Sequence, residues 1–280
     1  MLLGVDHLAF SATDIDQAVK TLSRWGYEPK FIARALLNAP SKKIYLAEWQ
    51  DDHDIAYCQP AEPGTAIEVT AHNKQYARTQ QAAFQALLCA KPDQVASTDQ
   101  AGLNAGQKKL LAAAGQAYGC NVHPLFLSDY NCFVYYMDRP AETNAKSRNI
   151  KSIIVMCADL DKSQGFWELF GFRAEPKEIS DADWRRLRFN SILTGRSLEL
   201  LLISSGEKIL AADSKLDSPG FPCLALLTSN LAAEIERLAA KGIKGSGEFA
   251  LAVGDKDLKI CLFSGLNGEM IELIQVADRR

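Results

Sequence analysis

The chain has 280 residues, of which 48% are hydrophobic and 23% charged, proportions typical of a globular protein with enough apolar residues for a sizeable core. Its formal net charge of -3 at pH 7 gives no electrostatic reason to expect binding to nucleic acid or to an anionic membrane surface. No apolar run reaches the roughly 18 residues that a membrane-spanning helix needs.

The N-terminal segment MLLGVDHLAF lacks the basic region and cleavage site of a signal peptide, and it predicts a first β-strand. Seven cysteines stand singly along the chain, without a CxxC pair. An odd number of scattered cysteines without a signal peptide indicates reduced thiols and a cytoplasmic location. Most of them are expected to be small buried hydrophobes.

Three segments, beginning at residues 7, 152 and 223, share one layout. Each starts with an apolar strand, has an Asp or Asn seven residues after its first position, and has a glycine twelve residues later. An Asp or Asn at the start of a helix accepts hydrogen bonds from free backbone N–H groups, and a glycine often ends the helix. The spacing therefore predicts three strand–helix–glycine units with these boundaries: Asp14 to Gly26, Asp159 to Gly171, and Asn230 to Gly242.

In the N-terminal half, residues 42–50 and 54–61 are expected to be the strands that finish the first unit. Residues 64–73 and 74–90 are expected to form the strand and helix of a second unit, with a closing strand at 131–137. Between them, residues 102–119 predict an additional helix. The polar segment 138–149, which is poor in apolar residues, is the expected linker between the two halves.

In the C-terminal half, the two units close in the same way. Residues 184–192 and 197–204 predict paired strands after Gly171, and residues 258–264 and 270–276 predict a hairpin after Gly242. A glutamate lies four residues past the turn glycine in each unit, at positions 199 and 272. Each unit is therefore expected to contain a strand, a helix and three strands, with an acidic residue in the last strand.

The repeated unit and the segments VDHLAFSATDIDQAV, DLDKSQGFWELFGF and GLNGEMIELIQ resemble the vicinal-oxygen-chelate superfamily. This superfamily includes glyoxalase I, bleomycin-resistance proteins and extradiol dioxygenases. The resemblance covers nearly the whole chain and implies an α+β fold of tandem βαβββ modules. It implies two domains, residues 1–138 and 150–280, each forming an open β-sheet cup. It is a weaker guide to activity, since one scaffold carries many reactions.

The resemblance also implies where metal ligands would lie, because in this superfamily they come from the first and last strands of paired units. In the C-terminal cup, Ser152 and Cys223 occupy first-strand positions, and Glu199 and Glu272 occupy last-strand positions. The absence of histidine there argues against extradiol ring cleavage. The glutamates are candidate catalytic residues, and Ser152 and Cys223 are candidates for substrate binding. Alternatively, the glutamates are strand residues that bind the ligand or pair with a basic side chain such as Arg186 or Arg188.

In the N-terminal cup, His7 occupies the first-strand position. Strand alternation places Glu68 and His72 on one face of their strand, with Glu68 assigned to the second unit. Asp54 lies 47 residues after His7, the same span that separates Glu199 from Ser152. His7, Glu68 and Asp54 together would suit Zn, Fe or Mn.

Two tyrosines, Tyr57 and Tyr135, are candidates for lining the substrate pocket of this cup. The alternative is that His7 is a hydrogen-bonded core histidine beside an apolar pocket. His53 and His123 have no assigned partners and are expected in surface loops.

The leading hypothesis is a cytoplasmic, metal-dependent enzyme of glyoxalase type, without an organic cofactor, that uses Zn, Fe, Mn or Ni. It would act on a small oxygenated molecule by isomerase or lyase chemistry. One rival is a metal-free binding protein that sequesters an aromatic compound, and another is a metal-free enzyme that uses Glu199 and Glu272 as acid and base. The sequence contains no P-loop, dinucleotide-binding, nucleophile-elbow or HExxH motif. A monomer and a homodimer are both compatible with the sequence.

Overall fold

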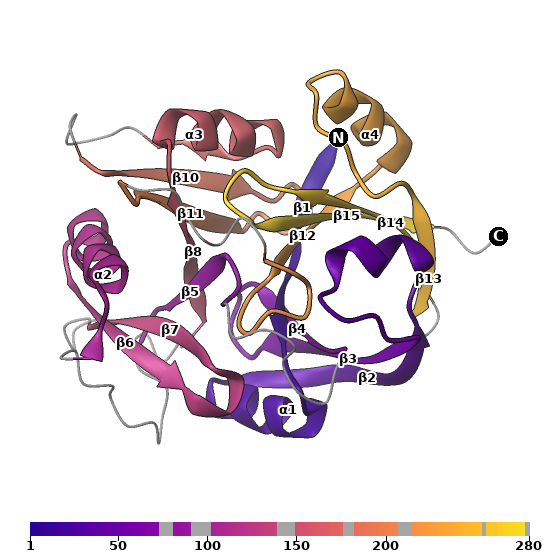
Figure 1. The fold of residues 1–280 in the computed structure, drawn as a ribbon, viewed down its shortest axis with the longest axis horizontal. Helices are drawn as coiled ribbons and strands as arrows, with labels where there is room; N and C mark the ends of the chain where they lie inside the picture. The colour runs from indigo at the N-terminus through magenta and orange to yellow at the C-terminus, as the bar shows by residue number, and fades with distance from the viewer. Residues whose placement is uncertain are drawn as a thin grey trace.

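The computed structural model describes residues 1–72, 81–90, 102–138, 149–175, 182–206, 214–253 and 256–277. Its fold is α+β, with two curled β-sheets (Figure 1), as the sequence predicts. The four α-helices of the described ranges are α1 Ile15–Arg24, α2 Ala105–Tyr118, α3 Leu160–Leu169 and α4 Leu231–Ala239. None of the helices in these ranges is long and apolar enough to span a membrane.

The first sheet has eight strands in the order β13-β14-β15-β12-β1-β4-β3-β2. It therefore joins the beginning of the chain to its end, which is visible in Figure 1 as indigo strands beside yellow ones. Within each unit the first and last strands run parallel (β1 with β4, β12 with β15), and the two units meet where β1 pairs antiparallel with β12. The strands are β1 Leu2–Ser11, β2 Tyr27–Leu37, β3 Asp52–Pro60, β4 Ala66–Ala71, β12 Cys223–Thr228, β13 Phe249–Val253, β14 Lys256–Ser264 and β15 Met270–Ala277.

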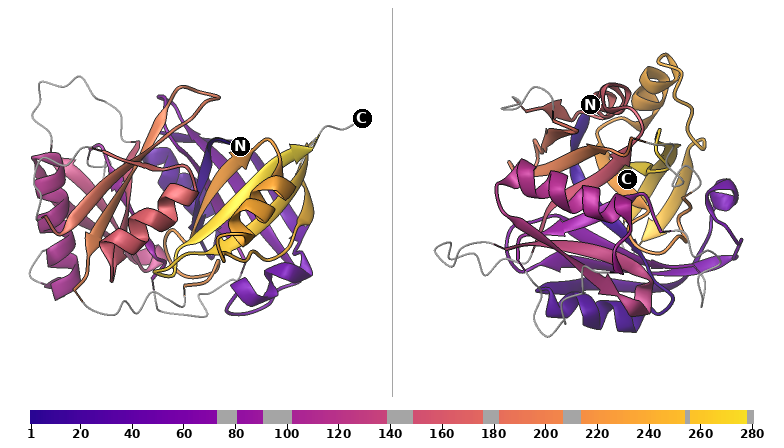
Figure 2. Two further views of the ribbon diagram at one scale, coloured as in Figure 1. Left: turned by 90° about the horizontal axis from the view of Figure 1, so that it is seen from above. Right: turned by 60° about the vertical axis from the view of Figure 1, so that its left-hand side comes forward.

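The second sheet has seven strands in the order β6-β7-β5-β8-β11-β10-β9 and is built from the middle of the chain. Here β5 pairs antiparallel with β8, just as β1 pairs with β12 in the first sheet. The two sheets lie side by side, with α2 at one end of the molecule (Figure 2). The strands are β5 Phe84–Leu88, β6 Asn121–Leu127, β7 Cys132–Asp138, β8 Ile150–Cys157, β9 Arg173–Ala174, β10 Trp184–Asn190 and β11 Ser197–Ser204.

The units thus pair first with last and second with third, whereas the sequence predicts that the first pairs with the second and the third with the fourth. The repeat defines each unit, but it carries no information about which apolar strand edge meets which. The division of the chain at the linker stays a prediction, because residues 139–148 lie outside the described ranges.

The predicted helix boundaries are confirmed at three places. The side chain of Asp14 accepts hydrogen bonds from the backbone N–H groups of the first turn of α1, and Asp159 and Asn230 do the same for α3 and α4. Gly171, which follows α3, has a φ of +86° and would bring a β-carbon to 2.9 Å from the ring of Phe189. Both the backbone angle and the close approach therefore require glycine there.

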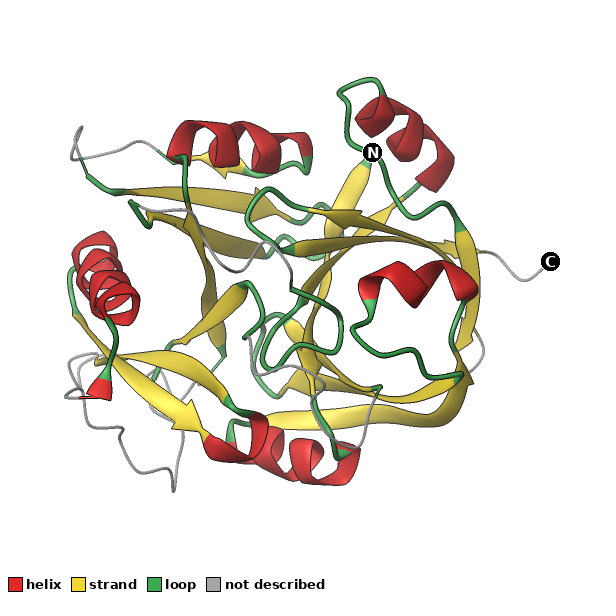
Figure 3. Ribbon diagram, viewed as in Figure 1, coloured by secondary structure: helices red, strands yellow, loops and turns green. Residues whose placement is uncertain are grey.

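The N-terminal half differs from the sequence prediction in two elements. Residues 42–50 were expected to be a strand, but Pro40–Tyr45 form a 3₁₀ helix, η1, with proline in its first turn. Residues 64–73, expected to begin the second unit, contain β4, the last strand of the first unit. In Figure 3, η1 lies over the opening that the curled first sheet surrounds.

The second unit itself begins at β5, within residues 74–90 that were expected to form a helix; residues 74–80 lie outside the described ranges. A short apolar run has the same sequence pattern in a fully buried strand and in a buried helix, so the pattern could not distinguish the two. Helix α2, expected as an additional helix, is the helix of this unit. The closing strand at 131–137 is confirmed as β7.

Helix α2 fills the concave face of the second sheet. Its buried residues pack against side chains of this face on β5, β7, β8, β10 and β11. The other three helices pack with the opposite faces of the strands in one large core that both sheets share. The residues of α2 in this contact are Leu110, Ala113, Ala114 and Ala117, and their partners include Leu87, Tyr135, Ile154, Trp184 and Leu201.

We expect Ala114→Asp to lower the free energy of unfolding by about 3 kcal/mol or more, because it places an unpaired carboxylate in this contact. Ala112→Asp, on the exposed side of the same helix, carries the same helix-propensity cost and should change the free energy of unfolding by about 0.5 kcal/mol. Urea unfolding of both variants measures the difference. Equal effects would contradict the packing of α2 inside the second sheet.

Candidate functional site

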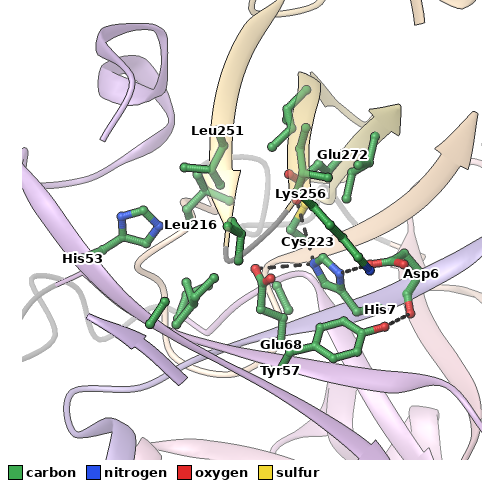
Figure 4. Close-up of a pocket in the computed structure, with 18 of the residues that line it drawn as sticks. Asp6, His7, His53, Tyr57, Glu68, Leu216, Cys223, Leu251, Lys256 and Glu272 are labelled. Carbon is green, nitrogen blue, oxygen red and sulfur yellow. Dashed lines mark hydrogen bonds and ion pairs between the residues drawn. The ribbon is translucent and has the colours of Figure 1, made fainter. Parts of the chain in front are cut away.

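A cavity of about 590 Å³ lies on the face of the first sheet that corresponds to the filled face of the second (Figure 4). Its volume is in the range of small-molecule sites. Much of its wall is apolar, with side chains from β13, β14 and β15. Polar groups gather at two places in this wall, around His7 and around His53, which lie on opposite sides of the cavity in Figure 4.

Strand register brings four residues together at the centre of the sheet. Glu68 of β4 lies opposite Ala9, two residues beyond His7 on β1. In the same way, Glu272 of β15 lies opposite Ala225, two residues beyond Cys223 on β12. Because β1 and β12 are antiparallel neighbours, all four side chains line one cavity. His7, Glu68, Cys223 and Glu272 are thus contributed by a single chain.

The imidazole of His7 is held between carboxylates. Its Nδ1 lies 2.8 Å from Oδ2 of Asp6, and its Nε2 lies 3.5 Å from Oε1 of Glu68 and 3.9 Å from Oε2 of Glu272. The side chain is 3% exposed, and Nε2 makes no hydrogen bond of normal geometry. Burial alone would lower the pKa of His7, but the charges of Glu68, Asp6 and Glu272 outweigh it and raise this pKa to about 9.

Glu272 and Cys223 are affected mainly by burial. Burial raises the pKa of Glu272 to about 7, with the charge of His7 acting in the opposite direction. A carboxyl group with a pKa near neutrality exchanges protons readily at physiological pH. Burial also raises the pKa of Cys223 well above its ordinary value, so Cys223 contributes a neutral thiol.

Tyr57 lines the cavity beside this cluster, as expected of a pocket residue. Its hydroxyl donates a hydrogen bond to the backbone oxygen of Asp6 at 3.3 Å, and its ring stacks on Phe31 with 5.5 Å between ring centroids. The rings of His7 and Tyr57 are nearly perpendicular, with 6.0 Å between their centroids. Tyr57 therefore supports Asp6, which in turn orients His7.

Asp54, the third residue of the predicted metal set, is not brought to this cluster. Residues of β3 alternate between the two faces of the sheet, and the odd-numbered ones, including Tyr57, line the cavity. The carboxylate of Asp54 accepts hydrogen bonds from the guanidinium of Arg34 at 3.0 Å and from the backbone N–H of Ala35 at 2.9 Å. It serves there to hold the neighbouring strand β2.

The other predicted residues lie in the second sheet. Ser152 donates hydrogen bonds to backbone oxygens of residues 153 and 199, and Glu199 forms ion pairs with Lys151 at 2.6 Å and Arg188 at 3.4 Å. Pairing of Glu199 with a basic side chain is one of the alternatives that the sequence allows. Tyr135 is buried against α2.

Register shows why the second sheet lacks a matching cluster. Ser152 on β8 corresponds to Cys223 on β12. Two residues further along each strand, Ala225 lies opposite Glu272 in the first sheet, whereas Ile154 lies opposite Leu201 in the second. Glu199 is therefore displaced by two residues from the position of Glu272. On the other side of the pseudo-symmetric pair, Gln85 takes the place of His7 and Tyr135 that of Glu68.

Two further histidines line the cavity. His53, expected on the surface, is 3% exposed, and its ring stacks on that of His72 with 4.7 Å between centroids. Burial and the charge of Lys42 lower the pKa of His53 to about 3 and the pKa of His72 well below its usual value. The even spacing of His53 and Tyr57 along β3 is the sequence signal that could have placed His53 here. His123 is partly exposed on β6, with Asp138 at 3.7 Å.

The comparison with solved structures identifies this architecture. A variant of glyoxalase I from Zea mays is 15% identical to this chain, covers 97% of it and 93% of the maize chain, and has a TM-score of 0.57. A second maize variant gives 16% identity, 97% and 92% coverage, and the same TM-score of 0.57. The chain has the vicinal-oxygen-chelate fold.

Other comparisons add little to this assignment of the vicinal-oxygen-chelate fold. TnmS3, an antibiotic-binding protein from Streptomyces sp. CB03234, matches 46% of this chain and 96% of its own length, at 21% identity and a TM-score of 0.33. No protein-family model matches the sequence, and no curated protein matches it significantly. The likeness to the maize enzyme therefore describes the fold, and the activity has to be argued from the site.

We expect the side-chain NMR signals of His7 to show protonation with a midpoint near pH 9 in protein treated with a chelator. Glu68→Gln should lower that midpoint, because it removes the largest of the charges that favour the imidazolium. His53 is the internal control and should stay neutral at pH 5, given its pKa of about 3. A midpoint for His7 near the ordinary value of about 6.5 would contradict the arrangement described above.

The same titration affects stability. Because the pKa of His7 in the folded protein lies above its ordinary value, protonated His7 stabilises the fold below about pH 6.5. This contribution, up to about 3 kcal/mol, is lost as the pH rises through about 9.

Proposed function

We propose that the chain is a glyoxalase-like protein that binds a small oxygenated organic molecule in the cup of the first sheet. We further propose that it acts on this molecule by metal-assisted isomerase or lyase chemistry. The observation that carries the proposal is the convergence of one imidazole and two carboxylates on a largely apolar cavity, at the first-strand and last-strand positions of two paired units.

The donor set fits a divalent cation. His7 Nδ1 is hydrogen-bonded to Asp6, so the lone pair of a neutral ring is left on Nε2, which is buried and faces both glutamates. One nitrogen and two carboxylates suit Zn, Fe, Mn or Ni. Among the described residues, no group of three or more His, Cys, Asp or Glu is already arranged to hold a metal ion, so the two glutamates would have to move towards Nε2 on binding.

A cation held by His7, Glu68 and Glu272 would supply Lewis acidity and stabilise negative charge on a substrate oxygen. The chain's own residues supply the rest. Asp6 fixes the orientation of His7, and the apolar wall excludes water. Glu272, whose pKa in the cation-free site is about 7, is the group suited, when it is not coordinated, to take a proton from a carbon next to a carbonyl and return it to a neighbouring atom. No second copy of the chain is needed to complete this set.

A metal-free binding protein is the second candidate, and a specific observation favours it. With a pKa of about 9, His7 is an imidazolium at neutral pH, and its positive charge offsets part of the negative charge of Asp6, Glu68 and Glu272. This protonated site needs a cation less than a site with a neutral imidazole would. The cavity would then sequester an organic compound between its apolar walls.

Zinc titration distinguishes the two candidates. If a cation binds, it displaces the proton of His7, and about one proton per cation should be released at pH 7.5. We expect stoichiometric binding by elemental analysis and calorimetry of purified protein after incubation with Zn, Fe, Mn or Ni. His7→Ala should lose both the cation and the proton release.

His53→Ala is the matched control, because His53 lines the same cavity on its other side. This variant should bind the cation as the wild-type protein does. Failure of the wild-type protein to bind any of the four metals would refute the metal-dependent proposal and leave the binding protein. Binding that survives His7→Ala would place the cation elsewhere.

A further inference from the structure

Lys42 is a buried lysine that faces the cavity from η1. It is 8% exposed, and within the described ranges its ammonium has no carboxylate within ion-pair distance. Its Nζ lies over the ring of Phe249, 5.7 Å from the ring centroid. A 3₁₀ helix has three residues per turn, so Lys42 shares its inward side with Tyr45, which anchors η1 through a hydrogen bond to Leu262 at 3.4 Å.

A charged group that is buried without a partner destabilises a protein, and a ligand of opposite charge would remove this cost. Besides Lys42, this part of the cavity contains a buried imidazole, His72, whose Nδ1 has no hydrogen-bond partner among the described residues. His72 and the stacked His53 are both neutral, because burial and the charge of Lys42 lower their pKa values. The region therefore presents one positive charge together with uncharged hydrogen-bonding groups.

On β3 and β4 the two histidines of this region lie beyond the acidic cluster, while the charge of Lys42 also reaches Glu272 and lowers its pKa. On the cavity face of β3 and β4, Tyr57 lies opposite Glu68, Ile55 opposite Thr70, and His53 stacks on His72. His72 is the fourth residue after Glu68, which corresponds to about 13 Å along an extended strand. The wall between them and around Lys42 includes apolar side chains such as Leu216 and Leu262.

We propose that Lys42 and His72 form an anion-binding subsite, and that the ligand of this cavity is an organic acid whose carboxylate pairs with Lys42. The oxygenated end of the same molecule would then face His7. A single positive charge in apolar surroundings matches a monoanionic carboxylate better than a doubly charged phosphate. This inference rests on the proposed function to the extent that it takes the cavity to be a small-molecule site.

Matched pairs of ligands test it. Straight-chain carboxylates from butyrate to decanoate, each with its uncharged amide, are titrated into the whole protein by calorimetry. We expect the wild-type protein to bind the best carboxylate about tenfold more tightly than its amide, as for a charge-assisted hydrogen bond. Lys42→Met, which keeps the length of the side chain and removes the charge, should abolish this preference while retaining binding of the amide.

Lys43→Met is the matched control, because Lys43 is the next residue of the same 3₁₀ helix and is exposed. It should keep the wild-type preference for carboxylates. The melting temperature of Lys42→Met should equal or exceed that of the wild-type protein, since the variant loses an unpaired buried charge. Equal affinity of the wild-type protein for carboxylates and amides, absence of binding by every compound, or an unchanged preference in Lys42→Met would each overturn the proposal.

Cation binding, measured on the same samples, separates this inference from the proposed function. If the protein prefers carboxylates through Lys42 but takes up no metal, the anion-binding subsite is supported and the metal-assisted chemistry is refuted. If the protein takes up a metal but shows no preference for carboxylates, the proposed function is supported and the anion-binding subsite is refuted.

Discussion

The antiparallel pairing of β1 with β12 is the contact on which the site depends. It joins the first unit of the chain to the last, and it sets His7 opposite Ala225. The parallel pairs on either side then carry Glu68 and Glu272 to the same cavity. The side-chain period of a strand is two, so a slip of one residue would turn each side chain to the opposite face. The interior positions of β1 and β12 are buried, and their burial fixes this register.

The second sheet shows what the same architecture becomes without such a cluster. Its central positions hold Gln85, Tyr135, Ser152 and Leu201. The face that forms a cavity in the first sheet is filled here by α2, mainly through alanines that allow a close approach of the helix. The loss of donor residues and the loss of open space therefore occur together. One cup therefore contains a cavity, and the other is filled as part of the core.

Much of the fold could be predicted from the sequence, because the features that specify a βαβββ unit are local. Asp14, Asp159 and Asn230 each cap a helix through their own side chain, and a glycine closes each helix. The pairing of units could not be predicted, since it depends on which exposed strand edges fit one another. For that reason the sequence places Glu68 in the second unit and Glu272 in a different cup from His7. That both glutamates are candidate site residues could still be predicted from the sequence.

Other parts of the site depend on long-range packing. Nothing local marks Lys42 as buried, because its position is set by contacts of η1 with the loop around Leu216 and with β14. Asp54 shows that a matching sequence spacing does not by itself place a residue in the site. Its distance along the chain from His7 matched that between Ser152 and Glu199, but an even-numbered position on β3 faces away from the cavity. Sequence spacing gives the strand, and alternation then decides the face.

The charges of the two sheets differ in a way that bears on function. In the second sheet, Glu199 is matched by Lys151 and Arg188, and Arg188 and Arg186 are also paired with Glu175. In the first sheet, the acidic cluster around His7 and the ammonium of Lys42 belong to one cavity without forming an ion pair with each other. The charge of Lys42 still acts on Glu272 through the cavity and lowers its pKa. The charges of the second sheet are thus neutralised by direct contact, whereas those of the first sheet face a cavity.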